Sequence, residues 1–211
     1  MKNRRYLLTA GASLLGAANP VLAAALRSTP TQVLGPFYPV EKPLDADADL
    51  TSIKGRSGRA QGQVVHVMGR VLNAKGEPVV GARLEIWQAN HHGRYTHPSD
   101  RRSVPLDPNF DGYADLRSDS EGRYRFKTIK PAGYPAEQGM RAPHIHFDVS
   151  ARVNRLVTQM YFPGEPLNEE DFVLAIAGSN RKLLIADLRP PTPDLEADSL
   201  LAIWDIVLEN G

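Results

Sequence analysis

The chain has 211 residues, with 25 lysines and arginines against 24 aspartates and glutamates, and no cysteine. This length suits one domain with its own core, and the balanced charge excludes the strongly basic surface that nucleic acid requires. Without cysteine there can be no disulfide, and a metal site must use histidine, tyrosine, aspartate or glutamate. The 17 glycines and 17 prolines favour many short strands over a few long helices.

The chain begins with a segment typical of an export signal. A positively charged start precedes a short, mainly small or apolar run over residues 6–18, and residues 21–25 offer small-residue cleavage patterns. We interpret residues 1–25 as a signal peptide, and the paired arginines within residues 3–8 favour the twin-arginine type over a Sec signal. The apolar run is shorter than the ~18 residues of a membrane anchor. We therefore expect a periplasmic or extracellular protein.

The next segment, residues 26–62, is rich in proline, glycine, aspartate and serine and predicts an N-terminal arm over a core. A single domain is expected over residues 63–211. Residues 169–188 carry the one helical pattern, which Gly178 is expected to split. Strands are expected at residues 64–72, 83–87, 123–128, 144–149, 156–162 and 202–208. Short strands between glycine and proline turns predict an all-β chain folded as a β-sandwich.

A pair of histidines lies in one of these strands. His144 and His146 flank Ile145, and because side chains alternate along a strand, both imidazoles point to one face while Ile145 points to the other. This arrangement can chelate a metal, although two ordinary polar residues on a sheet face would give the same pattern. Imidazole suits zinc, copper, iron and nickel, so the histidines do not choose the metal.

Two tyrosines lie in loops that a sheet would hold. Tyr95 follows the strand at residues 83–87, and Tyr134 is restricted to an extended or turn form by Pro135. Each tyrosine alone also fits a packing role. A phenol ionises near pH 10 in water, but coordination to a metal deprotonates it. Two phenolates with two imidazoles would form a hard, electron-rich ligand set suited to Fe(III).

Six short segments together carry a resemblance to a known family. They occur in order, at residues 85–90, 93–95, 107–110, 128–131, 141–147 and 158–162. In this order and spacing the chain resembles the intradiol ring-cleavage dioxygenases, nearest to the protocatechuate 3,4-dioxygenase type. The resemblance covers roughly residues 35–162, with a weaker similarity at the last strand.

The resemblance implies a β-sandwich whose long loops carry the active site of a mononuclear non-haem Fe(III) enzyme. Such an enzyme inserts both atoms of O2 into a catechol-type ring, such as catechol or protocatechuate, and gives a cis,cis-muconate-type product. It implies aromatic compound catabolism, with a small aromatic diol and O2 as substrates. The metal ligands that it implies are Tyr95, Tyr134, His144 and His146.

Three residues take further roles by the same resemblance. Tyr134 is expected to leave the metal when the substrate binds and to accept a catechol proton. Arg141 is expected to stabilise negative charge on the substrate ring, and Gln159 to line the substrate site. Contributions from His91, His92 and Tyr38 stay open.

The substrate and the assembly are also open. Residues 135–140 are fewer than in typical protocatechuate enzymes and lack the tryptophans often found there, so the accepted ring substituent is not fixed. A monomer, a homo-oligomer and a pairing with a homologous subunit all remain compatible with the sequence.

Two other classes of protein fit parts of the sequence. The glycine and valine pattern over residues 69–82 also occurs in non-enzymatic β-sandwich binding modules of the prealbumin-like type. A zinc or copper protein could instead combine His144 and His146 with Asp148, which lies on the same face of the strand. The binding module does not account for the two tyrosines together with the two histidines, whereas the alternative with Asp148 stays open.

Overall fold

The computed structural model describes residues 25–42 and 47–209. The predicted signal peptide therefore lies outside the described residues apart from its last position, and export stays a prediction. In residues 25–42 and 47–209, no helix has both the length and the apolar character needed to cross a membrane. The first strand begins at Val64, so the described part of the expected arm contributes no strand to a sheet.

The first sheet is built around the long strand β1. β4 pairs with β1 in antiparallel fashion, β10 and β11 lie parallel to it in succession, and β9 pairs antiparallel with β10. The strands of this sheet are β1 (Val64–Asn73), β4 (Arg123–Ile129), β9 (Asp187–Arg189), β10 (Leu200–Ile203) and β11 (Ile206–Leu208). The single last strand predicted over residues 202–208 is wrong, because it divides into β10 and β11.

The division of the last strand coincides with a close backbone approach at Gly69. Trp204 donates its backbone N–H to Met68 O at 3.0 Å, and Asp205 accepts the Arg70 N–H at 2.8 Å, so the two strands meet β1 on either side of this point. A Cβ atom on Gly69 would lie 1.9 Å from the Trp204 carbonyl oxygen. Only glycine fits there without moving the backbone.

We expect Gly69→Ala to destabilise the fold by at least about 3 kcal/mol, because the added methyl group overlaps a backbone atom that has no room to move. Urea unfolding of both variants measures the change. Gly81→Ala is the comparison, since Gly81 has φ +71° and open space around its Cβ position; it should cost only about 1 kcal/mol of backbone strain. Equal losses in the two variants would contradict the steric explanation.

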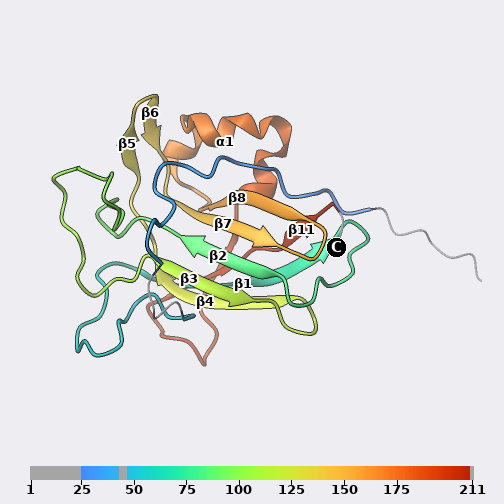
Figure 1. Ribbon diagram of the computed structural model, residues 1–211, viewed down its shortest axis with the longest axis horizontal. Coiled ribbons are helices and arrows are strands. Elements are labelled where there is room, and N and C mark those ends of the chain that lie inside the picture. The colour runs from blue at the N-terminus through green and yellow to red at the C-terminus, as the bar shows by residue number, and fades with distance from the viewer. Residues whose placement is uncertain (1–24, 43–46, 210–211) are drawn as a thin grey trace, which may run out of the picture.

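The second sheet carries the predicted histidine strand. It is antiparallel in the order β3-β2-β7-β8, with β3 (Tyr113–Arg117), β2 (Arg83–Trp87), β7 (His144–Ser150) and β8 (Arg155–Tyr161). Its inner face meets the first sheet in one core, where Tyr124 and Phe126 pack edge-on against Phe147 at 6.1 and 6.0 Å between ring centroids. Figure 1 shows the two layers and, outside the second sheet, the blue N-terminal arm. The all-β prediction is confirmed.

Two small elements lie next to the histidine end of β7. A hairpin of β5 (Tyr134–Ala136) and β6 (Gly139–Arg141) projects from the sheets, and helix α1 (Phe172–Ile176) lies beside it (Figure 1). Helix α1 is flanked by the 3₁₀ helices Pro166–Glu169 and Gly178–Leu184. The predicted helical segment is therefore confirmed in broken form, and Gly178, with φ +53°, begins its last part as expected.

Candidate active site

The two histidines share one face of β7, as the alternation predicts. Their Nε2 atoms lie 3.2 Å apart, and both side chains are buried. His144 donates from Nδ1 to the backbone oxygen of Ala142 at 2.6 Å. This hydrogen bond places the proton on Nδ1 and leaves Nε2 with a free lone pair, which is the form that binds a metal.

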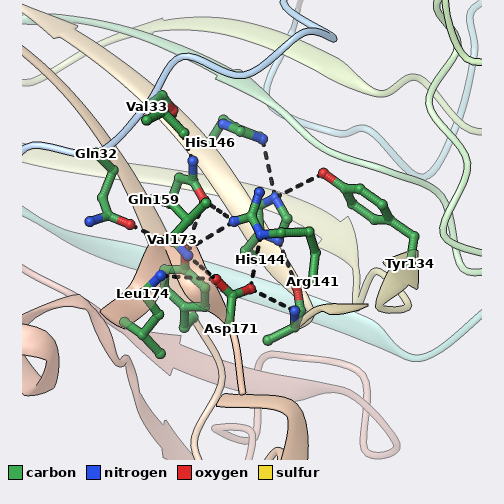
Figure 2. Close-up of polar contacts among 12 residues, drawn as sticks. Gln32, Val33, Tyr134, Arg141, His144, His146, Gln159, Asp171, Val173 and Leu174 are labelled. Carbon is green, nitrogen blue, oxygen red and sulfur yellow. Dashed lines mark hydrogen bonds and ion pairs between the residues drawn. The ribbon is translucent and has the colours of Figure 1, made fainter. Parts of the chain in front are cut away.

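The structure brings both tyrosines to the same point. The Tyr95 hydroxyl lies 3.1 Å from His146 Nε2 and 3.4 Å from His144 Nε2, and the Tyr134 hydroxyl lies 3.5 Å from His144 Nε2. Tyr95 comes from the loop after β2 and Tyr134 from the start of β5. Four side chains from three separate segments thus converge on one buried position, part of which Figure 2 shows.

The electrostatics of this cluster favour a cation. Burial, and then the positive charge of Arg141, hold the pKa of His144 and His146 well below the usual range, so both imidazoles are neutral at pH 7. Burial likewise raises the pKa of Tyr95 and Tyr134, so neither phenol ionises at neutral pH without a positive partner. Two neutral imidazoles and two ionisable phenols around one point form a donor set that suits a hard trivalent metal.

The tyrosines are needed for any metal at this position. Within residues 25–42 and 47–209, no group of three histidine, aspartate or glutamate side chains is arranged to hold a metal ion. The alternative ligand Asp148 is already engaged, because both of its carboxylate oxygens accept hydrogen bonds from Arg155 at 2.7 to 3.2 Å. The donor set of the cluster is thus two phenols and two imidazoles.

Aromatic side chains hold the cluster from outside. Trp87 stacks on His146 with ring centroids 4.7 Å apart and an angle of 10°, and Phe37 of the arm stacks on Tyr95 at the same distance. A Cβ on Gly35 would lie 3.1 Å from the His146 ring, so the arm backbone also packs against this ligand candidate. Together these contacts limit the freedom of the rings before any metal binds.

The sequence left the contributions of Tyr38, His91 and His92 open, and these residues lie outside the tyrosine and histidine cluster. Tyr38 packs edge-on against Trp87 at 5.0 Å and donates its hydroxyl to Glu85 at 3.0 Å, so it supports the ring that stacks on His146. His91 and His92 are half-buried with ring centroids 4.0 Å apart, and no contact joins either ring to the tyrosine and histidine cluster.

Arg141 is the charged residue of the site. It lies opposite Tyr134 in the β5–β6 hairpin and is almost fully buried. Its Nε donates to Asp171 at 2.9 Å, and its Nη2 donates to Gln159 at 2.6 Å and to the Tyr161 hydroxyl at 3.1 Å (Figure 2). Its Nη1 has no hydrogen-bond partner among the described residues. One nitrogen of the fork is therefore available to a ligand.

Gln159 lies behind Arg141. It is fully buried, its Oε1 accepts from Arg141 and from the Tyr161 hydroxyl, and its Nε2 donates to the backbone oxygen of Val33 at 2.8 Å. It is not among the residues that line the cavity described below. These contacts give it a supporting role for Arg141, and they also tie the arm to the site.

A cavity of about 660 Å³ opens beside the cluster. The arm, the loop after Tyr95, the β5–β6 hairpin and α1 form its walls, with Phe37, Arg102, Tyr134, Arg141 and Phe172 among the lining residues. Its volume lies within the range of ordinary small-molecule sites, and both Tyr134 and Arg141 reach it. A planar ring could thus meet the cluster and Nη1 of Arg141 from the same side.

Sequence reasoning missed two aspartates that support the site. Asp100 accepts the backbone N–H of Tyr95 at 2.8 Å and pairs with Arg102, whose guanidinium lies 4.4 Å from the centre of the Tyr134 ring. Asp171 binds Arg141 and caps α1. An aspartate directly before the apolar run of α1 is a helix N-cap signal, but nothing local indicates a contact with Arg141, 30 positions away.

The fold and the site together define a class of oxidising enzyme, and the comparisons with known proteins agree. A family model described as Dioxygenase matches residues 33–210. The protocatechuate 3,4-dioxygenase beta chain of Burkholderia cepacia is 47% identical over 181 residues, covering 83% of this chain and 77% of that protein. The chain belongs to the intradiol ring-cleavage dioxygenase family.

Other relatives are named for a different substrate, catechol. Catechol 1,2-dioxygenase 2 of Acinetobacter lwoffii is 32% identical over 163 residues, covering 70% of this chain and 56% of the relative. The mercury-inhibited structure of catechol 1,2-dioxygenase from Acinetobacter sp. ADP1 superposes with a TM-score of 0.66 at 28% identity, covering 86% of this chain and 63% of that one. The chain thus spans little more than half the length of these catechol relatives.

Proposed function

We propose that this chain is an Fe(III)-dependent intradiol dioxygenase that opens a catechol-type ring between its two hydroxyl-bearing carbons. Both atoms of O2 enter the product, which is a cis,cis-muconate-type diacid. The observation that carries the proposal is the convergence of two phenols and two neutral imidazoles on one buried position. Membership of the family supports it independently and disfavours a non-enzymatic binding module.

The proposed ligands of Fe(III) are Tyr95, Tyr134, His144 and His146. When bound, the metal supplies Lewis acidity and a template that brings the diol and O2 together. The protein supplies the rest. The hydrogen bond from His144 Nδ1 to Ala142 keeps the Nε2 lone pair available, and the stack of Trp87 on His146 fixes the plane of the second imidazole.

Two residues on the cavity wall act on the bound substrate in this proposal: one accepts a proton from it, and the other stabilises its negative charge. The phenolate oxygen of Tyr134 would accept the proton of one catechol hydroxyl, and so would act as a base when the substrate binds. Nη1 of Arg141 would stabilise negative charge on the ring, and it does so in a site with little water, where a fixed cation has a large effect. The apolar face of Phe37 beside Tyr95 helps to exclude that water.

The proposal also covers the substrate class, the assembly and the location of the protein. Relatives named for protocatechuate and for catechol support a small aromatic diol. The name of the Burkholderia relative as a beta chain supports pairing with a homologous subunit, alongside a homo-oligomer. The sequence of residues 1–25 supports export to the periplasm or beyond.

The visible absorption spectrum of the iron-loaded protein tests the proposal. Tyrosinate bound to Fe(III) should give a broad charge-transfer band and a burgundy colour. Anaerobic addition of catechol or protocatechuate should move this band to longer wavelength, and admission of O2 should then yield a ring-opened diacid. Comparison of the two diols ranks them as substrates. A protein that stays colourless after loading with Fe(III) would rule out tyrosinate ligation and, with it, the proposed activity.

A further inference from the structure

The Asp171 carboxylate accepts four hydrogen bonds. Two come from helix α1, and two come from the end of β6 and the residue that follows it. Its Oδ1 accepts the backbone N–H groups of Val173 and Leu174, both at 2.9 Å, and so caps α1. Its Oδ2 accepts Nε of Arg141 at 2.9 Å and the backbone N–H of Ala142 at 2.7 Å. Figure 2 shows this residue between the end of β6 and the start of α1.

We propose that Asp171 is a positioning residue that aims Nη1 of Arg141 at the substrate. The inference rests on the proposed function, since it concerns how Arg141 meets a bound diol. Asp171 does not line the cavity, so it acts through Arg141 and not on the substrate itself.

The geometry of the guanidinium carries this inference. Its three nitrogens lie in one plane, so fixing two of them fixes the direction of the third. Asp171 holds Nε, while Gln159 and the Tyr161 hydroxyl hold Nη2. Only Nη1 lacks a partner in residues 25–42 and 47–209, and Arg141 is a lining residue of the cavity. The contacts thus select which nitrogen a substrate meets.

Charge gives a second reason for this pairing. The side chains of Arg141 and Asp171 are only 5% and 0% exposed, so each would be a costly isolated charge in the protein interior. Gln159 and Tyr161 offer neutral acceptors, so Asp171 is the one anion that contacts the guanidinium in the part of the chain that the structure describes. Without it, Arg141 would be driven toward water or toward another acceptor, and Nη1 would lose its direction.

The link through Ala142 extends the effect to a ligand candidate. Asp171 fixes the N–H of Ala142, and the carbonyl oxygen of the same residue accepts from His144 Nδ1 at 2.6 Å. Phe172, directly after Asp171, lies on the cavity wall with its ring centre 5.6 Å from the guanidinium carbon of Arg141. One carboxylate therefore connects the cavity wall, the arginine and the histidine strand.

Asp171→Asn tests the inference with little change in volume. An asparagine still caps a helix well, but its NH2 group replaces the Oδ2 acceptor and would face the donors of Arg141 and Ala142. We expect kcat/KM for the preferred diol to fall about 100-fold, the loss that a small displacement of a positioned group can cause. Asp171→Ser, which keeps an N-cap oxygen but not the charge, should show a comparable loss.

A double-mutant cycle separates positioning from stability. In an Arg141→Met background there is no guanidinium to aim, so adding Asp171→Asn should change kcat/KM by less than about threefold. The crystal structure of Asp171→Asn should show the Arg141 side chain displaced from Gln159. A lower melting temperature with unchanged kcat/KM would reduce Asp171 to a helix cap, and an equal loss in both backgrounds would show that it does not act through Arg141. Either result overturns the inference.

The proposed function can fail separately. If the iron-loaded wild-type protein opens no catechol, the assigned activity is wrong, whatever the variants do. The positions of Arg141 in the wild-type and Asp171→Asn crystal structures still decide whether the carboxylate directs this side chain. An unchanged guanidinium position in the variant would overturn the positioning role without any activity measurement.

Discussion

Replacement of Tyr95 by phenylalanine is expected to lower ring cleavage by at least about 10³-fold, because it removes one of the two phenol oxygens proposed to bind Fe(III). The ring of phenylalanine keeps the stacking contact with Phe37, so the fold should survive. The iron content after reconstitution should fall, and the charge-transfer band should weaken and shift. Metal analysis, the visible spectrum and kcat/KM measured on one preparation check this expectation.

Tyr124→Phe is the matched control. Tyr124 is also a buried tyrosine that loses one hydroxyl in the variant, but its hydroxyl donates to the backbone oxygen of Trp204 at 2.6 Å in the core between the sheets. This variant should lose about 1 kcal/mol of stability and keep both its iron and its colour. If Tyr95→Phe also kept the full band and the full activity, Tyr95 would not be a metal ligand.

Two strands of the second sheet, β2 and β7, could be predicted largely from the alternation of polar and apolar residues. Arg83–Trp87 was predicted with its observed ends, since polar and apolar residues alternate over its first four positions. The same alternation predicted that His144 and His146 share a face, which their 3.2 Å separation confirms. Periodicity is a local property, and a strand that is buried on one face displays it in the sequence.

The remaining elements depend on contacts that periodicity does not encode. The β5–β6 hairpin has two three-residue strands that are exposed at most positions, so it shows no alternating pattern. β3 pairs with β2 but follows a long loop, and the Asp111-Gly112 turn signal before it does not by itself indicate this pairing. The approach of Tyr95 and Tyr134 to the histidines follows from how a loop and a hairpin pack on the sheet. From the sequence alone, that meeting could be expected only through the family resemblance.

Replacement of Arg141 by methionine is expected to separate catalysis from metal binding. We expect kcat/KM to fall about 10²- to 10³-fold, the usual effect of removing one fixed donor that stabilises developing charge. Arg141 is not a proposed ligand, so the iron content and the charge-transfer band of the resting protein should stay close to wild type. Stability should fall by about 3–5 kcal/mol, because the buried carboxylate of Asp171 loses its cation.

Arg155→Met provides the comparison, because it also removes an arginine that pairs with a buried aspartate, in this case Asp148 of β7. Arg155 holds Asp148 through two hydrogen-bonding nitrogens, but its side chain is 62% exposed and lies at the far end of β8 from Tyr161. Water can replace it, so the loss of stability should be smaller and kcat/KM should not change. Equal losses of activity in the two variants would show that the loss of either arginine–aspartate pair acts through stability alone. A loss confined to Arg141→Met, with the iron band intact, would assign the effect to the guanidinium of Arg141 on the cavity wall.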